Sequence, residues 1–132
     1  MDRTVLIADE DVQARIAAEK LPCPRGLTVR FAADGVEATE LVRQEPIALV
    51  VLDVDRAEMN GFDFLRRLQG RFEGLPLTHR PRILALTTRR DPAVKRFALQ
   101  LGADAVLRKP LVPSRFIAKA VQLTRSAARR AA

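Results

Sequence analysis

Acidic residues stand directly after two of the apolar segments in this sequence of 132 residues. Asp53 and Asp55 follow the apolar run 47–52, and Asp9 and Glu10 follow the first apolar run of the chain. A carboxylate at the end of a buried strand is costly to place unless a cation or a reaction uses it. We therefore expect Asp53 to serve as a nucleophile, a metal ligand or both.

A hydroxyl and an amine mark two later apolar segments, since Thr87 and Thr88 end one of them and Lys109 follows the other. An aspartate carboxylate can attack phosphorus to form an aspartyl-phosphate, while a hydroxyl, backbone N–H groups and an ammonium hold the transferred oxygens. Thr87 and Lys109 fit the roles of hydroxyl and ammonium. Magnesium prefers oxygen ligands, which Glu10 and Asp53 can supply. Together these residues predict magnesium-dependent phosphoryl transfer.

Five short apolar segments have to position these side chains. They are separated by stretches long enough for a helix, and they cover Thr4–Ala8, Thr28–Ala32, Ala48–Asp53, Arg82–Thr87 and Ala105–Arg108. The alternation predicts an α/β fold, in which right-handed crossovers join parallel strands into an open, doubly wound, five-stranded sheet with helices on both faces. The reactive site of such a sheet lies at the carboxyl ends of its strands, so the polar residues should meet there. Pro92 and Pro113 suit helix starts, and Gly102 suits a helix end.

The length and the composition fit one domain. A chain of 132 residues that is 48% hydrophobic can bury one core without disulfides. We expect the domain to cover residues 1–125, followed by a basic helical tail or the start of a linker at 126–132. The longest apolar run has six residues, and no basic region with a long apolar stretch opens the chain. We therefore expect a cytoplasmic protein without a membrane segment.

The net charge of +7 is divided unevenly along the chain. Residues 1–64 contain 7 Lys and Arg against 13 Asp and Glu, whereas residues 65–132 contain 16 against 3. A basic half could attract nucleic acid, but the chain has no Trp or Tyr to stack on bases. Its arginines also form no recognised nucleic-acid motif. We interpret the basic half as a solvated face and do not expect this domain alone to bind nucleic acid.

Four motifs in chain order resemble the receiver domain of two-component response regulators, over about residues 3–125. They are VLIADED with its acidic pair, LDVDRAEMNG with its first aspartate, ALTT with its threonine, and GADAVLRKP with its Lys-Pro end. The resemblance implies a flavodoxin-like (βα)5 arrangement with strand order 2-1-3-4-5. It also implies a signalling domain, not a dedicated enzyme, that is phosphorylated on Asp53. A histidine kinase or a phosphotransfer protein would be the donor.

The resemblance implies Mg²⁺ as the cofactor and a role for each acid. Glu10 would contact the ion directly and Asp9 through a water molecule. Asp53 itself and the backbone carbonyl of Asp55 would complete the protein ligands. The side chain of Asp55 is expected to act separately from its carbonyl. Asp55 and Arg89 would flank the path of attacking water, where their opposite charges could pair and hinder the attack.

The motifs ALTT and GADAVLRKP contain the residues expected to respond to phosphorylation, and each departs from the family pattern at one position. By the resemblance, Thr87 binds the phosphoryl group and signals its presence, Lys109 pairs with that group, and Pro110 follows a cis peptide bond, which proline alone makes cheap. Thr88 stands where a smaller Ala or Gly is usual, and its larger side chain would narrow access to the site. Val106 stands where an aromatic ring usually swings with the threonine, so the aromatic switch is absent.

The output is expected to pass through the face formed by the helix after Pro92, the strand 105–108 and the helix after Pro113. Thr87, Thr88 and the loop that includes Arg89 should carry the change to that face. A partner with an acidic surface should bind there, because the face collects Arg89, Arg90, Lys95, Arg96, Arg108, Arg115 and Lys119.

Two other functions compete with this interpretation. VVLDVDR also resembles the first motif of haloacid-dehalogenase-type phosphatases, but those enzymes need a later acidic pair and this chain has no Asp or Glu after Asp104. A pseudo-receiver, a binding module that ignores phosphate, is the second alternative. Its mark would be the loss of Asp53, Lys109 or the acidic pair, and none is lost, although Val106 keeps the alternative open. The chain is either a stand-alone receiver or part of a longer protein.

Overall fold

The computed structural model describes residues 3–8, 27–32, 35–55, 61–72 and 80–131. In chain order its elements are β1 (Arg3–Ala8), β2 (Leu27–Phe31), α2 (Gly35–Gln44), β3 (Ile47–Asp53), α3 (Gly61–Phe72), β4 (Arg82–Thr87), α4 (Pro92–Gln100), β5 (Ala105–Arg108) and α5 (Pro113–Ala131). The stretch between β1 and β2, where the first crossover helix is expected, lies outside the described residues, as do Asp9 and Glu10.

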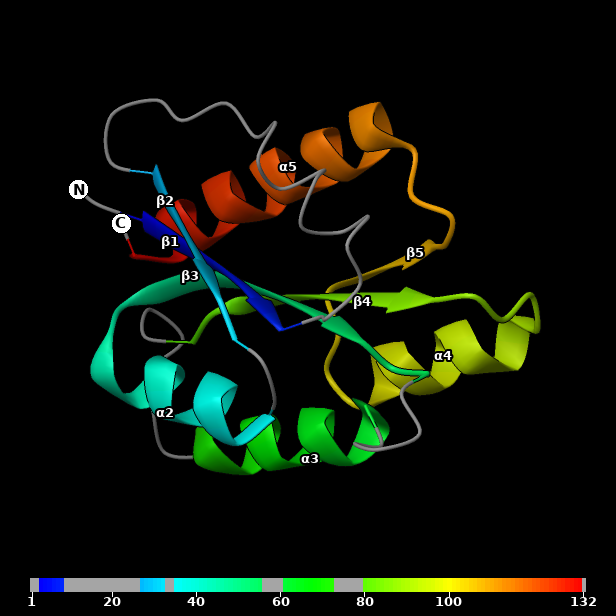
Figure 1. Cartoon of the computed structure of the whole chain (residues 1–132), viewed down its shortest axis with the longest axis horizontal. Helices are drawn as coiled ribbons and strands as arrows, with labels where there is room; N and C mark the ends of the chain where they lie inside the picture. Colours follow the sequence, from blue (N-terminus) through cyan, green and yellow to red (C-terminus); the bar gives the residue numbers. More distant parts are fainter. Residues whose placement is uncertain (1–2, 9–26, 33–34, 56–60, 73–79, 132) are drawn as a thin grey trace.

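The five strands form one parallel sheet with the order β2-β1-β3-β4-β5 (Figure 1). This confirms the doubly wound sheet and the strand order expected from the sequence. The bounds of β4 and β5 are those expected, whereas β1 and β3 each begin one residue earlier. The expectation for β2 was wrong by one residue at both ends. Its last expected residue, Ala32, still donates its N–H to the carbonyl of Ile7 at 3.0 Å, so the ladder runs slightly past the strand.

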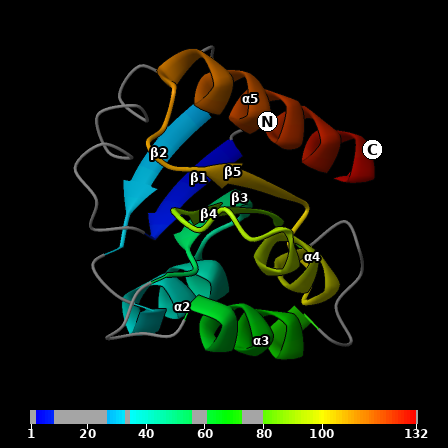
Figure 2. The same ribbon diagram turned by 90° about the vertical axis from the view of Figure 1, so that its right-hand side faces the viewer.

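One face of the sheet is covered by α2, α3 and α4 (Figures 1 and 2). Val50 and Leu52 point to this side from β3, where they pack with the buried ring of Phe64 and with Leu68 from α3. Ala98 is the buried residue of α4 in the same cluster. Small residues at such a position let a helix approach the sheet closely.

The other face of the sheet is covered by α5 (Figure 2). Leu49 and Val51 point to this side from β3, alternating with the residues that face α2, α3 and α4, and they pack with Phe116 and Ala120 of α5. Because β3 is buried on both faces, it reads as a continuous apolar run in the sequence. That continuity makes Asp53, at the end of the run, conspicuous.

The boundaries of α4 follow from its end residues. The Asp91 carboxylate accepts a hydrogen bond from the Ala93 N–H at 2.9 Å, and Pro92 occupies the first turn, where its missing N–H costs nothing. Gly102 ends the segment with a φ of 109°, which residues with a Cβ rarely adopt. The predicted start at Pro92 and stop at Gly102 are confirmed.

The helix α5 continues without a break to Ala131. The boundary of the domain at residue 125 remains a prediction. Within the described ranges, no helix is both long and apolar enough to cross a membrane.

Candidate functional site

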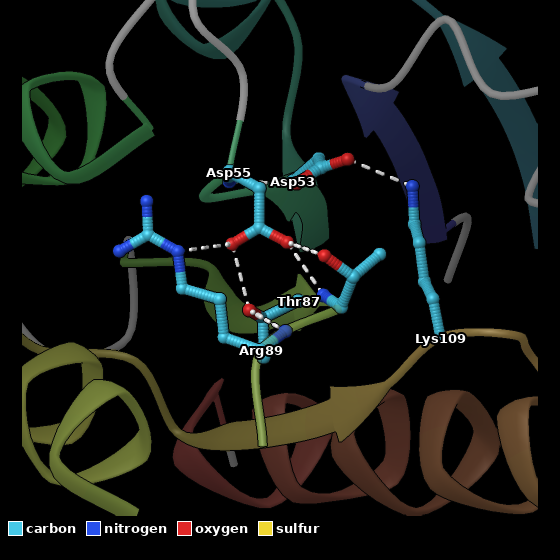
Figure 3. A network of polar contacts seen from close by, with 6 residues as sticks. Asp53, Asp55, Thr87, Arg89 and Lys109 are labelled. Atoms are coloured by element: carbon cyan, nitrogen blue, oxygen red, sulfur yellow. Dashed lines mark hydrogen bonds and ion pairs between the residues drawn. The ribbon is translucent and has the colours of Figure 1, made fainter. Parts of the chain in front are cut away.

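The site is built on the carboxyl ends of β3, β4 and β5. Asp53 ends β3, Thr87 ends β4, and Lys109 follows directly after β5. The strands are in register, with Asp53 opposite Leu86 on β4. Past the strand ends, the Lys109 N–H still donates to the Thr87 carbonyl at 2.8 Å. Backbone pairing therefore brings the acid, the hydroxyl and the amine to one edge of the sheet, as the sequence predicts (Figure 3).

Asp53 and Lys109 form a nearly enclosed ion pair. The Lys109 Nζ donates to Asp53 Oδ2 at 2.8 Å, and only 12% of the Asp53 side chain and 6% of the Lys109 side chain are exposed. The other oxygen, Asp53 Oδ1, accepts the backbone N–H of Asp55 at 2.7 Å. A buried charge needs such partners, because leaving it unpaired costs several kcal/mol. The ammonium thus stands where it can neutralise further negative charge that arrives on Asp53.

The carboxylate of Asp55 turns toward the end of β4 (Figure 3). Its Oδ1 accepts the hydroxyl of Thr87 at 2.7 Å. Its Oδ2 accepts both the backbone N–H of Thr88 and the Thr88 hydroxyl, the latter at 2.8 Å. Hydrogen bonds to an ionised acceptor are stronger than neutral ones, so Asp55 ties the residues after β3 firmly to the end of β4.

Arg89 adds a fourth partner to this cluster. Its Nε lies 3.8 Å from Asp55 Oδ1, and its backbone N–H donates to the Thr87 hydroxyl oxygen at 3.0 Å. The pair of Asp55 and Arg89 expected from the sequence is therefore present. The Arg89 side chain is 59% exposed, so solvent screens this pair and its own contribution to stability is small.

These surroundings set the protonation of Asp55. Partial burial by itself would raise the pKa of its carboxyl group. The hydrogen bonds from the Thr88 N–H, the Thr87 hydroxyl and the Thr88 hydroxyl, together with the charge of Arg89, outweigh that effect and lower the pKa below its ordinary value of 3.8. Asp55 is consequently an anion at neutral pH.

The described residues contain only part of the expected magnesium site. Asp53 offers carboxylate oxygen of the kind that Mg²⁺ prefers, on the strand beside β1, whose Ala8 is paired with Leu52. Asp9 and Glu10 follow Ala8 in the sequence. Within the described ranges, no group of three or more His, Cys, Asp or Glu could hold a metal. The part of the donor set that is described fits magnesium through the Asp53 side chain.

Two features of β5 complete the neighbourhood of the site. Val106 is partly buried and packs against the core cluster on the side of α4. The peptide bond between Lys109 and Pro110 is cis, the isomer that the resemblance implies. Val106 lines a cavity on one side of β5, and Lys109 and Pro110 line a cavity on the other side.

A cavity of about 350 Å³ lies between α4 and β5, and one of about 410 Å³ lies between β5 and α5. Thr87 and Val106 line the first cavity, so it reaches from the site to the surface. Basic side chains are the common feature of the two linings, contributed by Arg89, Arg90, Lys95, Arg108, Lys109 and Arg115.

The role of the Asp55 carboxylate toward β4 was not foreseen from the sequence. For Asp55 itself, only its backbone carbonyl and a pairing with Arg89 were expected. Thr88 was expected to narrow access to the site and to take part in the output switch, but not to bind Asp55. The signal that could have found it is the donor-rich trio Thr87, Thr88 and Arg89 at the end of the strand beside an acid.

Sequence comparison identifies related proteins. The chain matches the family model of the response regulator receiver domain over residues 5–121. It is 31% identical over 125 residues to the response regulator MprA of Mycobacterium ulcerans, covering 95% of this chain and 51% of that protein. It is also 31% identical over 127 residues to the transcriptional regulatory protein GltR of Pseudomonas aeruginosa, covering 95% and 50%. The chain spans about half the length of these two relatives.

Solved structures give the same result for the fold. The chemotaxis response regulator CheY4 of Vibrio cholerae is 26% identical, with a TM-score of 0.73 over 93% of this chain and 99% of that one. A response regulator from Thermotoga maritima, 22% identical, has a TM-score of 0.78 over 95% and 99%. The family match also favours a receiver over a haloacid-dehalogenase-type phosphatase. The chain belongs to the receiver-domain family of response regulators.

Proposed function

We propose that this receiver domain accepts a phosphoryl group on Asp53 from a histidine kinase or a phosphotransfer protein. The observation that carries the proposal is the enclosed pair of Asp53 and Lys109, with their charged groups 2.8 Å apart, at the strand ends. Thr87, on the strand between them, supplies a hydroxyl. In this role the domain acts in signalling and is not a dedicated enzyme.

The transfer is a displacement at phosphorus. One oxygen of the Asp53 carboxylate forms a bond to phosphorus while the bond between phosphorus and the imidazole nitrogen of the donor histidine breaks. That nitrogen keeps the electron pair and takes up a proton. The Lys109 ammonium pairs with the negative oxygens of the transferred group, and the Thr87 hydroxyl donates to one of them.

We propose that Asp53, Asp9, Glu10 and the backbone carbonyl of Asp55 hold Mg²⁺ for this reaction. The hard oxygen donor of Asp53 supports this assignment. When bound, the ion supplies positive charge that offsets the acids and the incoming phosphoryl group.

The output surface is proposed to be the basic face over α4, β5 and α5, and the partner to be a protein with an acidic surface. The two cavities with basic linings support this choice. The affinity of the phosphorylated domain for its partner should fall as the salt concentration rises. The variant Lys95→Glu/Arg96→Glu should lower the same affinity. We place this interaction in the cytoplasm, without a role for the membrane and without nucleic-acid binding by this domain alone.

A phosphorylation-independent interaction module is the second candidate. It is favoured by Val106, which cannot swing as an aromatic ring could because it is short and stiff at χ1. Such a module would keep the basic face and its partner but would not respond to a phosphodonor.

Intact-protein mass spectrometry after incubation with acetyl phosphate separates the candidates. With Mg²⁺, the wild type should gain the mass of one phosphoryl group, and chelation of the metal with EDTA should abolish the gain. Asp53→Asn should gain nothing, whereas Asp63→Asn, which changes an exposed carboxylate on α3, should behave as the wild type. An adduct on Asp53→Asn would show that Asp53 is not the phosphoacceptor. The absence of an adduct on the wild type would favour the interaction module.

A further inference from the structure

We propose that the Asp55 carboxylate competes with the phosphoryl group for the same two hydrogen-bond donors, the Thr87 hydroxyl and the Thr88 backbone N–H. The inference rests on the proposed function, because it concerns how phosphorylation of Asp53 is accommodated. Asp55 is a positioning residue in this scheme. It holds both donors in the unphosphorylated domain, and the phosphoryl group must displace it.

The number of available protons makes the competition necessary. The Thr87 hydroxyl has a single proton to donate, and it donates to Asp55 Oδ1 at 2.7 Å while its oxygen accepts the Arg89 N–H at 3.0 Å. The backbone N–H of Thr88 also has one proton, which goes to Asp55 Oδ2. Neither donor can serve a phosphoryl oxygen fully until its bond to Asp55 is broken.

The positions of the two carboxylates add repulsion to the competition. The Asp55 N–H donates to Asp53 Oδ1 at 2.7 Å, so the backbone of the competitor lies against the phosphoacceptor. A phosphoryl group carries a charge of about −1.5 to −2 near neutral pH. The Asp55 side chain is 16% exposed, and a like charge this close to the phosphoacceptor disfavours the negative charge that phosphorylation adds. Phosphorylation therefore drives Asp55 away from β4.

The exchange of partners reaches the output face through Arg89. Its backbone N–H bonds to Thr87 and its Nε pairs with Asp55, so both links involve residues whose partners change. Arg89 also lines the cavity between α4 and β5, together with Val106. Displacement of Asp55 thus alters the charged rim of this cavity, and it needs no aromatic ring at position 106.

The test uses beryllofluoride, which mimics the phosphoryl group on Asp53. Its affinity is measured by amide NMR for the wild type, Asp55→Ala and Asp55→Asn, all in the presence of Mg²⁺. Asp55→Ala frees donors that were bonded to a charge, so it should bind beryllofluoride at least about tenfold more tightly than the wild type. Asp55→Asn should lie between, because its amide oxygen accepts hydrogen bonds without a charge. A merely structural role for Asp55 predicts weaker binding, since a damaged site cannot gain affinity.

The matched control is Asp91→Asn, which removes a negative charge from the loop after β4 and keeps an N-cap for α4. It should bind beryllofluoride as the wild type does. A second readout needs no metal, because the Thr88 amide resonance of the metal-free protein should move upfield in Asp55→Ala and stay in place in Asp91→Asn.

Each outcome has one meaning. Equal or weaker binding by Asp55→Ala, beside clear binding by the wild type, overturns the competition and leaves the proposed function intact. An equal gain in Asp91→Asn also overturns it, because charge alone would then set the affinity. If the wild type fails to bind beryllofluoride, the proposed function falls and the competition falls with it.

Discussion

The hydroxyl of Thr87 and the carboxylate of Asp55, 32 residues apart in the sequence, share a hydrogen bond of 2.7 Å. The bond joins the ends of β3 and β4 beside the enclosed pair of Asp53 and Lys109. The residue expected to sense the phosphoryl group is therefore bonded to an acid of the protein itself. Several measurable properties depend on this arrangement.

The ion pair at the phosphoacceptor should contribute strongly to stability. Lys109→Met leaves the Asp53 carboxylate nearly buried without its cation, so the free energy of unfolding should fall by about 3–5 kcal/mol in urea denaturation. Lys119→Met, which removes an ammonium that donates to Gln122 on the surface of α5, should change it by less than about 0.5 kcal/mol.

The double variant Asp53→Asn/Lys109→Met checks the cause of this loss. It removes both charges, so it should recover most of the stability that Lys109→Met loses. A double variant as unstable as Lys109→Met would show that packing of the lysine chain, and not the unpaired carboxylate, produces the loss.

Stability should depend on acid pH through Asp55. The folded-state pKa of its carboxyl group is lowered from 3.8, so its stabilising contribution is present above the unfolded pKa and is lost as the pH falls through the folded pKa. The difference in the free energy of unfolding between wild type and Asp55→Asn should be constant above about pH 5. It should shrink as the pH falls below the ordinary pKa of an aspartate. A difference that stays constant down to acid unfolding would contradict this expectation.

The aspartyl-phosphate should be comparatively long-lived. The Arg89 side chain is 59% exposed, so it can follow the displaced Asp55 carboxylate, and the pair can then hinder in-line attack by water on the phosphoryl group. Phosphate release should be several-fold faster from Asp55→Ala/Arg89→Ala than from the wild type, when both start fully phosphorylated. Equal release rates would remove the pair from the mechanism.

Two glycines should respond to alanine with opposite signs. Gly102 has a φ of 109°, and a Cβ there would lie 2.1 Å from the Gln69 side chain, so Gly102→Ala should destabilise the fold by at least about 1 kcal/mol. Gly70, inside α3, has nothing within 4 Å of a Cβ, so Gly70→Ala should stabilise it by about 0.5–1 kcal/mol. Thermal unfolding of both variants checks the pair, and equal shifts would contradict it.

The sequence was sufficient to predict the strands and the residues at their ends because those signals are local. The apolar run that ends at Asp53 predicts a strand buried on both faces and a reactive carboxylate after it. Pro92 and Gly102 predict the ends of α4 by backbone conformation alone. The strand order came from the resemblance to the receiver family, and the sheet confirms it.

The orientation of the Asp55 carboxylate could not be predicted in the same way. It depends on the register that sets Asp53 opposite Leu86 and on the choice of side-chain rotamer, and neither is encoded in a local pattern. The donors that it meets, on Thr87 and Thr88, are 32 and 33 residues away in the sequence. Tertiary pairing, not local propensity, creates this contact.

A crystal structure of the protein with Mg²⁺ and beryllofluoride tests most directly whether Asp53 accepts the phosphoryl group. It also tests whether that group replaces Asp55 as the acceptor of the Thr87 hydrogen bond. We expect beryllofluoride on an Asp53 oxygen, hydrogen bonds to fluorine from the Lys109 ammonium and the Thr87 hydroxyl, and the Asp55 carboxylate moved away from both threonines. Beryllofluoride on Asp53 with the bond from Thr87 to Asp55 unchanged would contradict the displacement. A structure without beryllofluoride on Asp53, from crystals grown at saturating concentrations, would contradict the proposal that Asp53 accepts the phosphoryl group.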